Sequence, residues 1–362
     1  MGGGVWGRAV GGVVETKSET IGTVDTSQAR GSGSNGPAPV PPVTGTGTCK
    51  GELKETYGGY QFGFDLGALN LGGTGGNLHF GVMAGYFDSR SRDVTGDLAY
   101  QKVLPGIGGV IDTLDIYSPA GGFRAETKVP FLGLYSAFTQ GNFVVDVQVR
   151  QDFYLMRMTD QLNGLSDQPQ QASGISVLGN LAYKLPLPAD WFIEPSGGLI
   201  LLSRSGRPDQ RARFSNLPVL QPGTVTIDDI ESVMGRASVR IGTTIKAGPI
   251  TSSPFVTGTV FHEFAKDATA TSRIGGPEQY PCTLLFSQSL CNLQNVPSFF
   301  LNQYHNQILS TSTSRVGTFY QVGLGSAAAF GNSGWLGYGR VDFKFGDNVE
   351  GWNLSAGLRY IW

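Results

Sequence analysis

The sequence predicts an all-β chain that closes into a transmembrane antiparallel barrel of twelve strands. The first observation is an alternation of apolar and polar residues with a period of two, which recurs along the chain while helical periodicity is almost absent. The second is that tight turns and long connections follow one another in turn along the sequence. The third is the glycine content, 54 of 362 residues, which is roughly twice the average share.

The composition excludes several other classes of protein. The chain is 40% apolar and 15% charged, and its 26 Lys and Arg against 28 Asp and Glu give a net charge of −2, which argues against a nucleic-acid partner. No stretch approaches the roughly 18 consecutive apolar residues of a transmembrane helix, and residues 1–20 contain no apolar block suited to a signal peptide. The mean hydropathy of −0.07 is compatible with a membrane barrel, because its strands need only alternation.

Two segments show the alternation most clearly. One strand places Phe143, Val145, Val147 and Val149 on one face and Asp146, Gln148, Arg150 and Asp152 on the other. The last strand places Trp352, Leu354, Ala356, Leu358, Tyr360 and Trp362 opposite Asn353, Ser355, Gly357 and Arg359. One face of each strand therefore suits hydrocarbon and the other suits water.

The connections between the predicted strands differ in length at the two ends. The strands are expected to begin near Val5, Tyr57, Asn77, Phe123, Asn142, Ser173, Trp191, Val233, Pro254, Ser314, Trp335 and Val349. Tight turns contain residues 72–76, 140–141, 188–190, 248–253 and 331–333. The connections between these turns are residues 17–54, 93–121, 159–172, 204–229 and 269–313, and only the last, near 346–348, is short. Outer-membrane barrels have long outer loops and short periplasmic turns. A soluble β-sandwich is not expected to show this difference between its two ends.

Aromatic residues and glycines fit the same placement. Trp191, Trp335, Tyr360 and Trp362 adjoin tight turns or the C-terminus, where an interface girdle is expected. Inward-facing small residues, expected at Gly63, Gly81, Gly85, Gly198, Gly242 and Gly357, would leave room for a ligand, a plug or a channel.

Eight short segments occur in an order that resembles the β-domains of bacterial autotransporters. They are residues 4–12 (GVWGRAVGG), 57–67 (YGGYQFGFDLG), 78–86 (LHFGVMAGY), 133–149, 191–199 (WFIEPSGGL), 235–245 (GRASVRIGTTI), 254–264 (PFVTGTVFHEF) and 357–362 (GLRYIW). Together they cover essentially the whole chain, so that residues 1–362 are interpreted as one β-domain.

The resemblance implies a translocator of type V secretion in the outer membrane of a Gram-negative bacterium, with its loops on the cell surface. Its expected partners are outer-membrane lipid, the barrel-assembly machinery and its own N-terminal passenger, and it is expected to be a monomeric barrel without a cofactor. The assembly signal is expected in the alternating Leu354, Ala356, Leu358, Tyr360 and Trp362. Because the first strand begins four residues after the chain does, we expect a unit separated from its passenger, lumen helix and signal peptide, or a truncated gene product. The alternative is a free-standing barrel, which could not secrete a passenger in cis.

Charged residues that alternate with apolar ones are predicted to line the lumen. They are Arg8, Asp65, Asp146, Arg150, Glu194, Arg236, Arg240, Lys246, Glu263, Arg340, Asp342 and Arg359. Mixed signs can pair across the lumen and keep it hydrated, or they can hold a lumen helix and guide an unfolded chain. The resemblance of their segments makes Glu194 and Arg236 the first candidates for lumen contacts.

Catalytic and metal sites are not expected. His79 is predicted to face the lumen, His262 and Glu263 lack a serine or second carboxylate at a diagnostic spacing, and His305 lies in a polar segment. The cysteines lack zinc-site spacing; Cys282 and Cys291, nine positions apart, could form a local disulfide, which leaves Cys49 without a partner.

Residues 18–54 are rich in Gly, Pro, Ser and Thr and are predicted to form a flexible first loop. Two other functions share the composition and the strand count. One is a channel for small solutes, and the other is an adhesive or structural barrel that acts through its long loops.

Overall fold

A computed structural model gives the architecture. It describes residues 2–25, 30–33, 36–39, 44–95, 98–105, 111–118, 122–160, 165–206, 210–212, 223–273 and 308–362. Among these residues there is no helix long and apolar enough to cross a membrane.

Twelve antiparallel strands form a closed barrel, which confirms the predicted fold class and strand number. The strands are β1 (Gly2–Asp25), β4 (Thr44–Leu71), β5 (Gly76–Asp93), β8 (Phe123–Gln140), β9 (Phe143–Asp160), β10 (Leu165–Tyr183), β12 (Trp191–Gly206), β15 (Ile230–Thr243), β17 (Ile250–Glu263), β20 (Thr318–Phe330), β21 (Trp335–Gly346) and β22 (Val349–Ile361). Each pairs with the next in this order, and β1 pairs with both β4 and β22. Closure leaves the barrel without a free edge.

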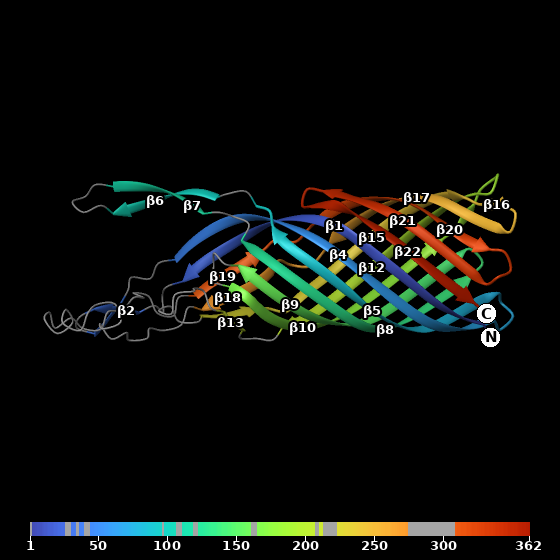
Figure 1. Ribbon diagram of the computed structural model, residues 1–362, viewed down its shortest axis with the longest axis horizontal. Coiled ribbons are helices and arrows are strands. Elements are labelled where there is room, and N and C mark those ends of the chain that lie inside the picture. Colours follow the sequence, from blue (N-terminus) through green and yellow to red (C-terminus); the bar gives the residue numbers. More distant parts are fainter. Residues whose placement is uncertain are drawn as a thin grey trace.

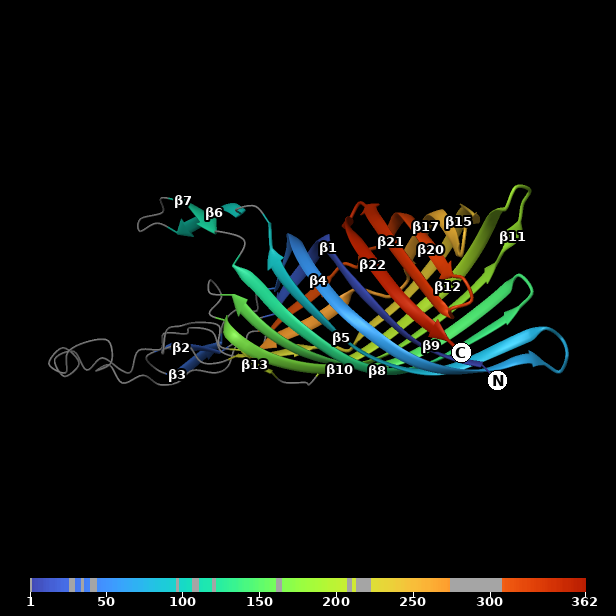
Figure 2. The same ribbon diagram turned by 45° about the vertical axis from the view of Figure 1, so that its right-hand side comes forward.

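The two ends of the barrel differ (Figure 1). Both termini and the tight turns lie at one end, where Gly4 is paired with Ile361, and this end also holds the short strands β11 (Leu185–Pro186) and β16 (Ile245–Ala247). At the other end the sheet continues as β13 (Gln210–Ala212), β14 (Gly223–Ile227), β18 (Ala268–Arg273) and β19 (Ile308–Thr313). The hairpins β2–β3 (Arg30–Gly33, Gly36–Pro39) and β6–β7 (Leu98–Pro105, Ile111–Ser118) also lie there (Figure 2).

The barrel wall is apolar outside and polar inside. In β20, Tyr320, Val322 and Leu324 are exposed on the outer face, whereas Phe319 and Gln321, which alternate with them, are buried. The exposed outer residues also include Phe62, Phe80, Leu132, Leu134, Leu199, Val256 and Leu358, and Trp191, Trp335 and Trp362 near the turns. A belt of this kind suits the hydrocarbon of a bilayer and has no counterpart on a water-soluble protein.

The structure corrects two predicted loops. Within the predicted flexible segment 18–54, β1 and β4 remain paired out to Asp25 and Thr44. The connection predicted over 159–172 is mostly strand, because β9 and β10 pair up to Asp160 and Leu165. Main-chain pairing beyond the membrane needs no apolar side chains, so the sequence pattern that marks the belt gives no sign of these extensions.

The inward glycines were expected to leave open room in the lumen. In the structure, aromatic rings of neighbouring strands occupy the space over most of them. A Cβ on Gly63 would lie 2.3 Å from the Trp6 ring, and one on Gly81 would lie 2.2 Å from the Tyr135 ring. Rings also cover Gly85, Gly242 and Gly357, from Phe131, Phe192 and Tyr338 respectively. Gly198 is approached by the Arg236 side chain instead. These glycines therefore admit rings that a side chain at the same position would displace.

Gly81→Ala should destabilise the barrel by about 1–3 kcal/mol, because the new methyl group overlaps the Tyr135 ring, which has to move. Urea unfolding of the protein in lipid vesicles measures the change. Gly258→Ala is the matched control, since apart from its own chain neighbours no described residue has an atom within 4 Å of that Cβ position. Equal stability of the two variants would show that the ring position is not restricted by the glycine.

Candidate functional site: the charged lumen wall

The polar face of the wall encloses a cavity of about 470 Å³. Six of the twelve predicted charged residues line it: Arg8, Glu194, Arg236, Arg240, Arg340 and Asp342. Strands β1, β12, β15 and β21 supply these residues, and Lys344 of β21 joins them. Lys246 lies apart from them, exposed in β16 beside a tight turn.

Asp65 is the centre of an extensive polar cluster. Its carboxylate is fully buried and accepts hydrogen bonds from Arg359 Nη2 at 2.7 Å and from the Tyr135 hydroxyl at 2.8 Å. His79 Nδ1 lies 3.2 Å away, and the Tyr135 oxygen accepts a hydrogen bond from Trp6 Nε1 at 2.6 Å. Because Asp65 lies on β4 and Arg359 on β22, the cluster links the two strands that flank β1.

A second buried carboxylate, Asp152, is paired within its own strand. Arg150 Nε lies 2.8 Å from its Oδ1, and the Arg150 guanidinium also lies over the Phe131 ring, 4.6 Å from its centre. Two residues apart on a strand, these side chains share a face. The aromatic ring and the carboxylate together fix the guanidinium against the wall.

The ion pairs that line the cavity run along the wall, which corrects the expectation of pairing across the lumen. Arg240 Nη1 of β15 lies 3.0 Å from Glu194 of β12, its direct partner on the neighbouring strand. Arg340 Nη2 lies 2.6 Å from Asp342 on the same strand, and Asn353 donates to that carboxylate at 3.1 Å. Each of these ion pairs therefore joins residues of the same strand or of two neighbouring strands.

Other cations of the wall have neutral partners. Arg8 donates to the Gln61 side-chain oxygen at 2.6 Å, and Arg236 donates to the Asn180 oxygen at 2.9 Å. Asn180 in turn donates to Asp146 at 3.1 Å. Arg236 is thus linked to the Asp146 carboxylate through the side-chain amide of Asn180.

Glu263 and His262 lie on opposite faces of β17. Glu263 is buried and accepts hydrogen bonds from the backbone nitrogens of Val233 at 2.7 Å and Ala265 at 3.0 Å, and from the Ser232 hydroxyl. His262 is exposed; its Nδ1 lies 2.7 Å from the Thr318 hydroxyl, and its ring packs edge-on against Phe264. Because successive side chains of a strand point to opposite faces, these two sequence neighbours point away from each other and form no catalytic pair.

In the described part of the chain, no group of three or more His, Cys, Asp and Glu residues could hold a metal ion. Cys49 is an exposed free thiol. The predicted disulfide of Cys282 with Cys291, and His305, lie outside the described residues.

Several polar residues of the wall were not predicted from the sequence, because the prediction selected charged residues and these are neutral. Gln61, Tyr135 and Asn180 hydrogen-bond a charged residue, Thr257 lines the cavity beside Arg240, and Trp6 donates to the Tyr135 hydroxyl. Alternation could have found them, since Trp6 is two residues from Arg8 and Gln61 is four from Asp65, on the same faces. Charge alone identifies the ionised members of the polar network and not their neutral partners.

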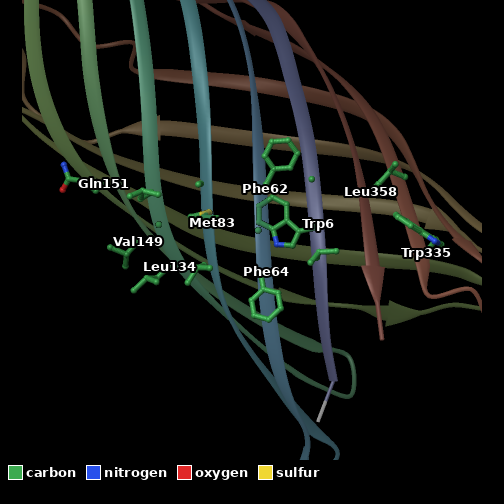
Figure 3. Close-up of a pocket in the computed structure, with 16 residues that line it drawn as sticks. Trp6, Phe62, Phe64, Met83, Leu134, Val149, Gln151, Trp335 and Leu358 are labelled. Carbon is green, nitrogen blue, oxygen red and sulfur yellow. The ribbon is translucent and has the colours of Figure 1, made fainter.

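The outer wall also has a shallow hollow, of about 920 Å³ (Figure 3). Phe62 and Phe64 of β4, Leu134 of β8, Val149 of β9 and Leu358 of β22 line it. The lining is almost entirely apolar. It belongs to the lipid-facing belt and offers no group for chemistry.

A closed barrel with an apolar belt and a polar, charged lumen is a transmembrane β-barrel of the outer-membrane type. The model of the autotransporter β-domain matches residues 45–280, and the chain belongs to this family. It is therefore the translocator domain of an autotransporter, an outer-membrane protein of type V secretion to which a passenger belongs.

Two solved structures share the fold. The β-domain of the Bordetella autotransporter BrkA is 17% identical, with a TM-score of 0.56 over all of both chains. The transport unit of the autotransporter AIDA-I from Escherichia coli is 12% identical, with a TM-score of 0.58 over 98% of this chain and 89% of that one. No curated protein sequence matches the chain.

Proposed function

We propose that the lumen described above is the path along which the N-terminal passenger segment of this autotransporter passes, or in which it is held, during secretion or surface display. The observation that supports this most directly is the position of β1. It begins beside the C-terminus at the end with the tight turns, so that a segment attached to it starts at the periplasmic mouth of the lumen. The polar wall then offers such a segment a hydrated route to the other end.

A reporter fusion tests this function. A signal peptide and a reporter with a protease site are attached ahead of Met1, and we expect protease added to intact cells to cleave the reporter. The same fusion without residues 360–362 is the control, because the barrel should then fail to assemble. A folded, membrane-embedded barrel whose reporter stays inside the cell would contradict the proposal.

The end with the strand extensions is proposed to face the cell surface. Cys49 pairs with Thr20 in this part of the sheet and is exposed. In a chain with Cys282→Ser and Cys291→Ser, an impermeant maleimide added to whole cells should label Cys49. In the matched variant that also carries Cys49→Ser and Gly141→Cys, the only thiol lies in a tight turn and should stay unlabelled. Labelling of the turn alone would invert the orientation.

The barrel is proposed to have no hydrolytic activity of its own. The Glu263 carboxylate accepts three hydrogen bonds, and His262 points to the opposite face of the strand. The two side chains therefore cannot act together as a general acid and base. Refolded protein should leave peptide and phospholipid substrates intact. An activity that is present in the native sequence and lost in His262→Ala would contradict this prediction.

Further partners follow from the wall. The apolar belt fits the acyl chains of outer-membrane lipid, and a closed barrel without a free edge can function as a monomer. The alternating C-terminal residues are proposed as the signal read by the barrel-assembly machinery.

A further inference from the structure

On the lumen wall, arginines are more exposed to the lumen than the carboxylates with which they pair. Among the described residues, four arginine–carboxylate pairs lie on this wall, and in each the arginine is the more exposed partner: Arg150 22% against Asp152 0%, Arg240 37% against Glu194 18%, Arg340 21% against Asp342 5%, and Arg359 32% against Asp65 0%. The carboxylates lie behind their arginines. The face that meets the lumen is thus more positive than the near-balance of charges along the chain suggests.

The lining of the cavity of about 470 Å³ has more positive than negative side chains. Among the described residues that line it are five cations, namely Arg8, Arg236, Arg240, Arg340 and Lys344, against the two carboxylates Glu194 and Asp342. The two carboxylates already pair with Arg240 and Arg340. The other three cations hydrogen-bond no carboxylate of this lining directly: Arg8 and Arg236 donate to amide oxygens, and Lys344 makes no hydrogen bond in the described part of the chain.

An independent observation lies at the same place. Thr257 is 4% exposed, lines the cavity, and has a buried hydroxyl without a hydrogen-bond partner among the described residues. Its direct neighbour across the sheet, Arg240, has a buried Nε that likewise makes no hydrogen bond there. Buried polar atoms are normally satisfied, so this part of the wall has the hydrogen-bonding capacity to receive an acceptor from outside it.

We propose that this cavity binds carboxylate side chains of the polypeptide segment in the lumen, so that the segment held by the translocator is acidic at the level of Arg8, Arg236 and Lys344. The choice of a polypeptide as the ligand rests on the proposed function; the sign of its charge rests on the wall alone. Carboxylate oxygens accept charge-assisted hydrogen bonds from guanidinium and ammonium groups. A volume within the usual range of ligand sites, about 300–1,000 Å³, admits several side chains and excludes a folded domain.

Peptide binding to the refolded full-length chain in detergent tests the proposal. The probes are a fluorescent glutamate-rich peptide, a lysine-rich peptide of equal length, and free glutamate as a competitor. We expect the acidic peptide to bind at least tenfold more tightly than the basic one, with an affinity that falls as salt is raised. Free glutamate should compete only weakly, because it lacks the neighbouring carboxylates of a peptide.

The variants locate the site. Arg8→Gln, Arg236→Gln and Lys344→Gln combined should weaken binding of the acidic peptide at least tenfold. Arg90→Gln is the control, because Arg90 is exposed and pairs with Glu126, away from the cavity. Heat-modifiable migration on gels shows whether each variant is folded; if the triple variant is not, Arg236→Gln and Lys344→Gln are measured singly, with a loss of at least threefold expected for each.

Three outcomes would overturn the inference: equal binding of both peptides, unchanged binding in the folded variants, or competition by free glutamate as strong as by the peptide. The reporter fusion keeps these results separate from the proposed function. Display of reporters regardless of linker charge, together with unselective peptide binding, would leave the translocator role intact and remove the acidic preference. Failure to display any reporter would contradict the proposed function, while charge-selective peptide binding would still support the site.

Discussion

Asp65→Asn is expected to lower the free energy of unfolding of the barrel by about 3 kcal/mol. The substitution keeps the shape of the side chain and removes its charge, so the Arg359 guanidinium loses the carboxylate 2.7 Å away. Removing one partner of a buried ion pair costs about 3–5 kcal/mol, and the partial exposure of Arg359 places this pair at the lower end. The Tyr135 hydroxyl loses a charged acceptor at the same time.

Urea unfolding in lipid vesicles measures the loss, and Glu126→Gln is the control. Glu126 pairs with Arg90 at 3.7 Å on the exposed surface, where such a pair contributes at most about 1 kcal/mol. If the two substitutions have equal effects, the Asp65 cluster does not help to hold β4 and β22 on either side of β1.

The sequence predicted the membrane-spanning part of the fold well, because a bilayer imposes a simple rule. Each strand of the belt has to present apolar residues to lipid, and the alternation through Phe143–Asp160 or Val349–Ile361 is visible without any knowledge of the neighbours. Outside the membrane the rule no longer applies. The extensions of β1 to Asp25 and of β4 back to Thr44 are held by main-chain pairing, which leaves no trace in the side-chain pattern.

The site was predictable to a smaller degree. Alternation identified which charges face inward, such as Asp65 and Arg359, but not which of them touch. These two residues are 294 positions apart, and their contact depends on the register of β1 with β4 and β22. Register is a relation between strands that the pattern of one strand does not contain. The same limitation hid the rings over Gly63 and Gly81, since a glycine can mark open space or the place of a neighbouring ring.

The end of the chain completes the closure that the Asp65 cluster supports. Tyr360 pairs with Val5 of β1, and its ring lies 5.1 Å from that of Trp335 and 6.2 Å from that of Trp362. The Trp362 ring stacks on Phe64 at 6.0 Å, and its backbone nitrogen donates to the Gly3 carbonyl at 3.2 Å. These aromatic contacts join β21, β22 and β4 at the turn end of the barrel.

Deletion of residues 360–362 is therefore expected to abolish membrane-embedded, heat-modifiable protein in cells. Without these residues Gly4 and Val5 of β1 lose their partners on β22, and each backbone group left unpaired in lipid costs several kcal/mol. Trp352→Phe is the matched control, because Trp352 is an exposed aromatic residue of the same strand, paired with Val13 far from the closing contacts. It should leave the amount of assembled protein nearly unchanged. Normal assembly of the shortened chain, seen as a heat-modifiable band in the membrane fraction, would show that neither closure at Gly4 and Val5 nor recognition by the assembly machinery needs the terminal aromatic residues.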